Sequence, residues 1–327
     1  MARHRKLCLP LVLFSGLFLL AGCYNGPAVS GTFDRSYSVT GPIRVELANA
    51  SGDVDITGSA DGKVHVHGQV RASGFGSDTP QKRLDETVSN PPIEQRGDTF
   101  RIGKEFSHMR HVSITYTIEV PRDTQVSATV ASGAQTIRNV RGPVRVQSAS
   151  GSVRVEKIER DAQLSTASGS VSATDIGNEV HVTSASGSVN VSNTKGDIIV
   201  SALSGVIRIA KPGGRIEADT ASGEVEIQGA ANDVQAHAAS GRVSVQGNPG
   251  ANSYWELKTV SGTVQLVVPA SANLHLSAEA TSGEIRTDIP IVVEEQGKHS
   301  LRAHMGNGGG RVDVHTVSGE IHLSGAK

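Results

Sequence analysis

A Ser-Gly pair recurs along most of this chain at a nearly constant spacing. Successive serines of these pairs are 18 residues apart six times, and the last three intervals are 21, 21 and 36 residues. A repeat of this length is typical of a solenoid, in which each repeat forms one coil and buries its apolar side chains against its neighbours. The pairs begin at Ser132, Ser150, Ser168, Ser186, Ser204, Ser222, Ser240, Ser261, Ser282 and Ser318.

Each repeat contains two short runs in which apolar and polar residues alternate. Val144 and Val146 precede the pair at Ser150, and Val153 and Val155 follow it with Arg154 between them. A period of two is the strand period, so we expect two short strands per coil with their aliphatic side chains inward. The sequence therefore predicts an all-β fold, a parallel β-solenoid that is right-handed because connections between parallel strands prefer that hand. Only 3% of the residues are aromatic, so Val, Ile, Leu and Ala must fill the interior.

The Ser-Gly pair lies between the two runs and is predicted to form a corner of the coil. Glycine tolerates the positive φ that a corner requires, and serine can hydrogen-bond to nearby backbone. Stacked coils would align these pairs in a ladder, which we interpret as structural, with a binding or modified serine ladder as the alternative. The predicted turn ladder comprises Ser132, Gly133, Ser150, Gly151, Ser168, Gly169, Ser186, Gly187, Ser204, Gly205, Ser222, Gly223, Ser240 and Gly241.

The N-terminus has the pattern of a bacterial lipoprotein signal. Basic residues are followed by an apolar run from Leu7 to Leu20, which is too short to span a bilayer comfortably. The segment Leu20-Ala21-Gly22-Cys23 resembles a lipobox, which implies cleavage before Cys23 and acylation of that residue. The other cysteine, Cys8, lies within the signal, so an intramolecular disulfide is not expected in the mature chain. Two or three acyl chains would hold the protein firmly to a membrane.

The remaining sequence divides by the regularity of its pattern. Residues 72–98 are polar and interrupt the strand pattern, and Gln81–Val88 are predicted to form a short helix. Residues Asn248–Asn252 are expected to bulge out as a loop, and the 36-residue interval that contains Pro290 is expected to be looped out. The expected organisation is a signal peptide at 1–22, a lipidated tether at 23–41, an irregular β region at 42–125 with the insertion 72–98, and regular repeats at 126–327.

Two further patterns resemble a known family. Ile118–Thr124 (IEVPRDT) precedes the repeated Ser-Gly-x-Val-x-Val, and Thr316–Leu323 (TVSGEIHL) closes the chain. These segments are similar to those of the DUF4097 family, often labelled adhesins, and the resemblance covers roughly residues 40–325. It implies a β-helical fold and a location in the cell envelope, and it implies no catalytic residues.

Charge and motifs exclude several classes of function. The chain has 31 Lys and Arg against 32 Asp and Glu, without a basic patch, so we expect no nucleic-acid partner. The glycine loops of nucleotide-binding folds and of calcium-binding nonapeptides are absent from the sequence, and we expect no cofactor. His65 and His67 share a strand face, as a metal pair would, but lack a third ligand, so no metal site is predicted.

One acidic cluster is a weak candidate for a binding or catalytic site. Glu217 and Asp219 are expected to share an outward face, and so are Glu224 and Glu226. Paired carboxylates could act as acid and base on a glycan or bind a cation, but we interpret them first as part of a solvated surface.

We therefore expect a non-catalytic lipoprotein of the bacterial envelope, held to the outer membrane through Cys23, whose β-solenoid acts as an adhesin-like binding module or scaffold. Tyr24 in place of Asp after Cys23 favours the outer membrane. A glycan or an envelope protein is the expected partner. The alternatives are a carbohydrate-active enzyme that uses the acidic face, and a polymer formed by end-to-end pairing of open coil edges.

Overall fold

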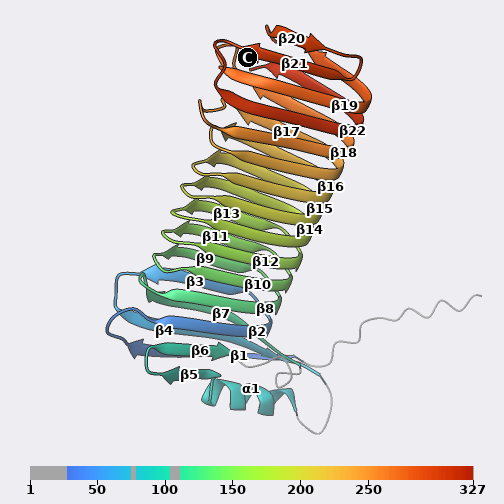
Figure 1. Cartoon of the computed structure of the whole chain (residues 1–327). Coiled ribbons are helices and arrows are strands. Elements are labelled where there is room, and N and C mark those ends of the chain that lie inside the picture. Colours follow the sequence, from blue (N-terminus) through green and yellow to red (C-terminus); the bar gives the residue numbers. More distant parts are fainter. Residues whose placement is uncertain (1–27, 75–78, 104–110, 327) are drawn as a thin grey trace, which may run out of the picture.

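A largely parallel sheet of many strands forms almost the whole molecule (Figure 1). The computed structural model describes residues 28–74, 79–103 and 111–326. The predicted signal peptide and the lipobox at Leu20–Cys23 lie outside these residues. The all-β class and the parallel strands predicted from the repeat are confirmed.

The middle of the molecule is a stack of coils with two strands each. In one coil, β10 (Val144–Ser150) leads through the Ser-Gly corner into β11 (Val153–Ile158). The next coil repeats this with β12 (Ala162–Ser168) and β13 (Val171–Ile176). β10 pairs in parallel with β12, and β11 pairs in parallel with β13, each 18 residues further along the chain. We call this arrangement the coil stack.

From residue 180 the two strands of each coil merge into one long bent strand. These strands are β14 (Val180–Thr194), β15 (Ile198–Pro212), β16 (Ile216–Ala230), β17 (Val234–Gly247) and β18 (Tyr254–Val268). Register is kept across the longer interval before β18, since Val234 pairs with Trp255. The predicted loop at Asn248–Asn252 is therefore confirmed, because it absorbs the three additional residues outside the strands.

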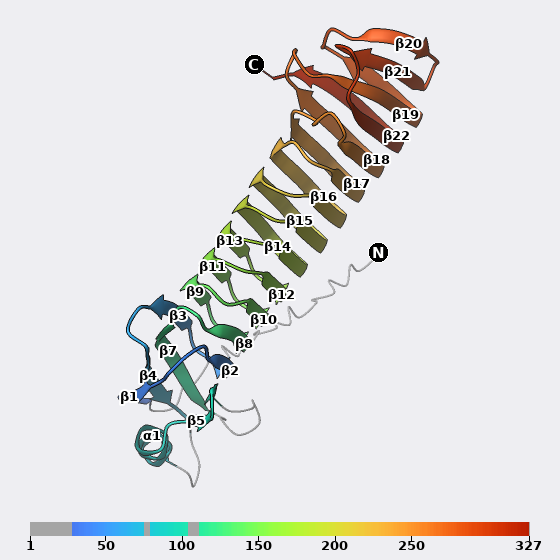
Figure 2. The ribbon, with the colours of Figure 1, turned by 60° about the vertical axis from the view of Figure 1, so that its left-hand side comes forward.

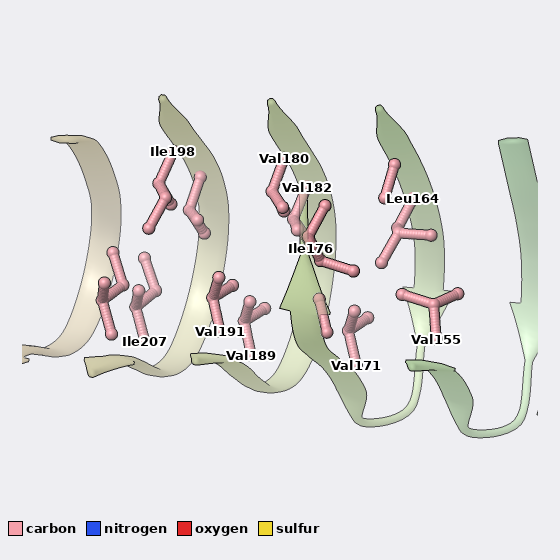
Figure 3. Packing of buried hydrophobic residues seen from close by; sticks show 14 of the residues in the cluster. Val155, Leu164, Val171, Ile176, Val180, Val182, Val189, Val191, Ile198 and Ile207 are labelled. Carbon is pink, nitrogen blue, oxygen red and sulfur yellow. The ribbon is translucent and has the colours of Figure 1, made fainter. Parts of the chain in front are cut away.

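The core is a column of aliphatic side chains enclosed by the coils. Val180, Val182 and Ile198 point across the coil interior towards Val189 and Ile207 (Figure 3). All five are fully buried, whereas the residues that alternate with them on the strands, such as His181, Asn190 and Arg208, are partly or wholly exposed. Each layer of aliphatic side chains rests on the layers above and below it, so stacking removes apolar surface that a single coil would leave in water.

The C-terminal strands do not stack in the order of the sequence. β22 (Gly310–Gly325) lies between β18 and β19 (Leu274–Thr287) and pairs in parallel with both. β21 (Ser300–Met305) then pairs antiparallel with β19, and β20 (Val292–Gln296) pairs antiparallel with β21.

The expectation that the 36-residue interval is looped out was wrong. Leu301, Ala303 and Met305 alternate with more exposed residues and are buried, so this segment forms a strand over the last coil. β20 and β21 thus cap the C-terminal end of the coil stack.

The N-terminal end shows the same exchange of order. β2 (Arg44–Ser51) pairs in parallel with both β6 (Thr99–Gly103) and β8 (Gln125–Ser132). β3 (Val54–Ser59) likewise pairs with both β7 (Val112–Pro121) and β9 (Gln135–Val140). The first coil in the sequence is therefore the second in space, and the coil of β6 and β7 lies outside it.

Antiparallel strands and a helix cover this outer coil. β4 (Lys63–Ala72) pairs antiparallel with β7, and β5 (Ile93–Arg96) pairs antiparallel with β6. The helix α1 (Pro80–Ser89) contains the predicted helical segment 81–88, and the Thr79 side chain caps it by accepting from the Lys82 backbone N–H. Figure 2 shows α1 at one end of the molecule and β20 at the other.

Part of the predicted tether is folded. Residues 29–38, which we had assigned to the tether at 23–41, form β1 (Val29–Ser38), and β1 pairs antiparallel with β4. Phe33 is buried and its ring lies 6.4 Å from the ring of Tyr116 in an edge-to-face contact. This strand is difficult to recognise in the sequence, because Phe33 is its one buried residue and polar residues surround it.

Candidate functional site

The Ser-Gly ladder runs along one corner of the coil stack. Its glycines have φ between 123° and 144°, a region that L side chains rarely adopt. A Cβ at Gly169 would overlap the backbone carbonyl of Gly151, one coil away, and the other glycines of the array are equally close to their neighbours. Glycine is required here by both its backbone conformation and the approach of the next coil.

The serines of the ladder face solvent and hydrogen-bond locally. The Ser186 hydroxyl donates to the Ala167 carbonyl at 3.5 Å, and the Ser204 hydroxyl donates to the Ala185 carbonyl at 3.4 Å. Both bonds join one coil to the preceding one, so they add to the stacking of coils. These contacts favour the structural interpretation of the ladder over a serine nucleophile.

The four candidate carboxylates form two pairs and not one site. Glu217 and Asp219 precede the corner at Ser222, whereas Glu224 and Glu226 follow it, on the other strand run of β16. Register places Gln235, His237, Arg242 and Ser244 beside them on the next coil.

Each of these carboxylates has a basic partner. Distances between the charged atoms are 3.8 Å for Glu217 with Arg215, 3.0 Å for Asp219 with His237, 4.0 Å for Glu224 with Arg242 and 3.3 Å for Glu226 with Arg208. These contacts account for the four carboxylates as members of surface ion pairs between neighbouring coils or neighbouring residues.

The histidine pairs do not assemble a metal site within the described residues. His65 and His67 lie on the same outward face of β4, and His67 Nδ1 is 2.8 Å from Asp34 Oδ1. His111 is described, whereas its neighbour in sequence, His108, falls outside the described residues. In residues 28–74, 79–103 and 111–326, no group of three or more His, Cys, Asp or Glu side chains could hold an ion.

A groove lined in part by apolar side chains lies near the C-terminal end. It has a volume of about 580 Å³ and crosses β16, β17, β18, β22 and β19. We call it the C-terminal groove. One wall is a row of ionisable residues that occupy the same position on successive coils, namely Asp219, His237, Lys258, His315 and Glu279.

A second set of residues lining the C-terminal groove, two positions further along the same strands, is apolar and exposed. Val260 and Val317 stand directly before the corner serines and are 56% and 51% exposed. Leu203, at the same position three coils from Val260, is 65% exposed. The sequence analysis missed this surface, although a signal existed: Ala or Thr fills this position elsewhere in the repeats, and Leu or Val does so only here.

Ion pairs connect several of the ionisable residues that line the C-terminal groove. His237 lies between two carboxylates, with Nδ1 3.0 Å from Asp219 Oδ1 and Nε2 3.4 Å from Glu256 Oε2. Lys258 Nζ forms a close ion pair with Glu256 on the same strand. The hydrogen bond from Lys258, with a smaller contribution from His237, lowers the pKa of the Glu256 carboxyl below its usual value, and partial burial opposes this shift.

No helix in the described part of the chain is both long and apolar enough to cross a bilayer. The predicted lipidation site, Cys23, falls outside the described residues.

Comparison with known proteins places the fold. A family model described as Toastrack DUF4097 matches residues 43–324. The chain is also similar to the crystal structure of a candidate cell adhesion protein from Clostridium sporogenes, with 10% identity, a TM-score of 0.22 and coverage of 91% of this chain and 100% of that one. A candidate adhesin from Bacteroides fragilis has 13% identity, a TM-score of 0.31 and coverage of 90% and 97%. None of the curated proteins matches.

Proposed function

Because the chain belongs to the Toastrack DUF4097 family, we propose that it is a non-catalytic binding module of the bacterial envelope, anchored by lipid on Cys23. In this proposal the coil stack is a right-handed β-solenoid that works as a rigid adhesin-like or scaffold element. The observation that carries the binding role is the C-terminal groove, where exposed Val260 and Val317 face a row of ionisable side chains. An apolar strip beside charged groups is typical of surfaces that bind partners.

β1, the first strand after the proposed anchor in the sequence, and the C-terminal groove lie at opposite ends of the molecule. Five residues separate Cys23 from the start of β1 at Val29, so the lipid would hold the N-terminal cap within roughly 20 Å of the membrane surface. Figure 1 shows β1 and α1 at one end and β19 and β22 at the other. The C-terminal groove would therefore face away from the membrane, where a glycan or protein partner can reach it.

The arrangement of the acidic residues supports a non-catalytic role. Glu217 and Asp219 are separated from Glu224 and Glu226 by the corner, and every one of the four has a basic partner. The alternative, a carbohydrate-active enzyme, requires glycan turnover that is lost in Glu224→Gln and Glu226→Gln. We expect the two variants and the wild type to show the same background turnover.

The anchor is tested by Cys23→Ser, with Cys8→Ser as the matched control. We expect Cys23→Ser to release the protein from the membrane fraction, whereas Cys8→Ser leaves attachment to the outer membrane intact. Protease added to intact cells then tests exposure of the C-terminal coils. Unchanged membrane attachment of Cys23→Ser would disprove the lipid anchor, and protection of these coils until the outer membrane is opened would replace adhesion by a periplasmic scaffold.

A further inference from the structure

The corner opposite the Ser-Gly ladder has an unusual backbone. On five successive coils the same position has a positive φ although its residue is not glycine. These residues are Asn139 (φ 59°), Lys157 (56°), Asp175 (57°), Asn193 (54°) and Lys211 (51°). On the next coil the position is held by Gly229, with φ 80°. We call these residues the left-handed ladder, and Figure 1 shows β9, β11 and β13 ending along this edge.

Two members of the left-handed ladder are poorly suited to this conformation. Asn and Asp tolerate positive φ because their short side chains bond to local backbone, but lysine has no such compensation. Gly229 shows that glycine fits the same corner. Lys157 and Lys211 therefore keep side chains that the backbone alone does not favour, and strain of this kind is concentrated at functional sites.

A groove of about 380 Å³ lies over the left-handed ladder, and several basic side chains line it. Its lining includes the exposed side chains of Arg122, Lys157 and Lys195. None of these three has an ion-pair partner among the described residues. The carboxylates of the groove are engaged instead, since Glu159 Oε1 is 3.2 Å from Arg141 Nε and Asp175 accepts a hydrogen bond from the Asn193 side chain.

A second groove of about 560 Å³ continues from the first, and the two share Glu159. It adds Arg44 and Arg160, for which the described residues again provide no ion-pair partner. Of its other carboxylates, Asp123 lies 3.8 Å from Arg141 and Asp98 accepts a hydrogen bond from the Thr99 hydroxyl at 3.3 Å. We call the two together the corner groove.

We propose that the corner groove binds an acidic glycan through the carboxylates of its uronic acid residues. Guanidinium and ammonium groups without internal partners gain charge-assisted hydrogen bonds to carboxylates, and clustered basic side chains of this kind bind acidic polysaccharides. The groove passes from coil to coil, as a linear polymer would. No aromatic side chain appears among its described lining residues, whereas single-stranded nucleic acids bind through base stacking on aromatic rings.

This inference goes beyond the proposed function, and its test does not depend on the lipid anchor. The full mature chain carrying Cys23→Ser would be titrated with an oligogalacturonate and with its fully methyl-esterified form. The ester has the same sugars and length without the negative charges. We expect the acid to bind at least about tenfold more tightly than the ester, with an affinity that falls as salt is added.

The left-handed ladder offers a matched pair of variants. Lys157→Gly removes a cation from the corner groove, whereas Lys211→Gly makes the same change at the same backbone conformation outside it. We expect Lys157→Gly to weaken oligogalacturonate binding about tenfold and Lys211→Gly to leave it unchanged. Both should fold with a melting temperature equal to or above that of the wild type, because glycine relieves the positive φ.

Four results would overturn the proposal. The first is equal affinity for the acid and its methyl ester, and the second is an equal loss of binding in Lys157→Gly and Lys211→Gly. The third is binding of anionic phospholipid vesicles, lost in Lys157→Gly, without binding of the oligogalacturonate, which would make the ligand a membrane headgroup. Competition by inorganic phosphate alone at the concentration of the uronate would likewise show a site for free anions and not for a glycan.

Discussion

Each regular coil turns at two corners. Both corners contain a residue with a positive φ, but the type of residue differs between them. At the Ser-Gly corner the next coil approaches so closely that a side chain is excluded, as at Gly169. At the left-handed ladder φ is positive as well, but the neighbouring coil leaves room for a side chain, since a Cβ added at Gly229 would have its nearest atom at 3.8 Å. A positive φ therefore demands glycine only where the neighbouring coil also occupies the space of the Cβ.

Gly169→Ala tests this at a single residue. The alanine would need a φ near 132° and would place its Cβ against the Gly151 carbonyl. We expect the free energy of unfolding to fall by about 3 kcal/mol or more, measured by urea denaturation. Gly97→Ala is the control, because φ is 62° there and no atom lies within 4 Å of the added Cβ. It should cost about 1 kcal/mol, and an equal loss in both variants would contradict the role of coil contact.

The Glu256 carboxyl makes a specific contribution to stability in acid. Its pKa is lower in the folded protein than in the unfolded chain, chiefly through the hydrogen bond from Lys258. The stabilisation is therefore complete above the unfolded value of about 4.5 and is lost as the pH falls through the lower folded pKa. Thermal unfolding of the wild type and Glu256→Gln should differ by a constant amount from pH 6 to 7, about 1 kcal/mol or less, and converge well below pH 4.5. A difference that persists unchanged at low pH would contradict this assignment.

At the scale of elements, the strands of the repeats could be predicted from the sequence but the order of the end coils could not. Val153 and Val155 and their equivalents specify strand, face and register through a period of two. The coils at Ser282 and Ser318 carry the same signature, so nothing in the pattern says that β22 enters between β18 and β19. That choice depends on contacts between distant segments.

The order of the ionisable residues in the C-terminal groove could not be predicted for the same reason, although the valines before the corner serines could have marked its apolar part. Lys258 lies beside His315, and His315 lies beside Glu279. The spatial order of these three residues therefore differs from their order in the sequence. The acidic pairs on β16 could be predicted because they lie within one repeat. β1 escaped prediction because Phe33 alone marks its buried face, and burial of Phe33 depends on β4 and Tyr116.

Removal of β22 tests whether the C-terminal coils need this strand to remain folded. A chain that ends at Gly309 leaves β19 without its parallel partner and exposes the edge of β18. We expect hydrogen exchange to show loss of protection in β19 and β21, while the coils of β10 to β15 stay protected. A chain that lacks only Lys327 is the control and should match the wild type. Retained protection of β19 in the shorter chain would show that β21 alone can hold it.

At the scale of the whole molecule, additional strands cover the end coils, and we therefore expect no end-to-end polymer. At the C-terminal end the last strand is β20, whose edge carries Glu294 and Glu295, and a bulge shifts its register against β21. Charges and bulges at an edge discourage pairing with another chain. Glu294 lies 2.8 Å from His304, and Glu295 lies 3.0 Å from Arg302, so both are held in place.

The edge of β20 gives a test of association. We expect the mature chain to be monomeric by light scattering across a concentration series. Replacing Glu294 and Glu295 by Val would join them to the exposed Val292 and Val293 and produce an uncharged apolar edge. We expect that double variant to associate as its concentration rises, whereas Glu94→Val on β5 changes only one residue of a short edge and should remain monomeric. Polymers of the unmodified chain would contradict the protective role of the caps.

The exchanged order of the end coils also constrains how the molecule is made. A chain that leaves the ribosome with its N-terminus first can add the regular coils one after another as they emerge. β19 is synthesised before β22 but must wait for it, because β22 at Gly310–Gly325 is its parallel partner. A chain that stops before β22 therefore leaves the edges of β18 and β19 unpaired.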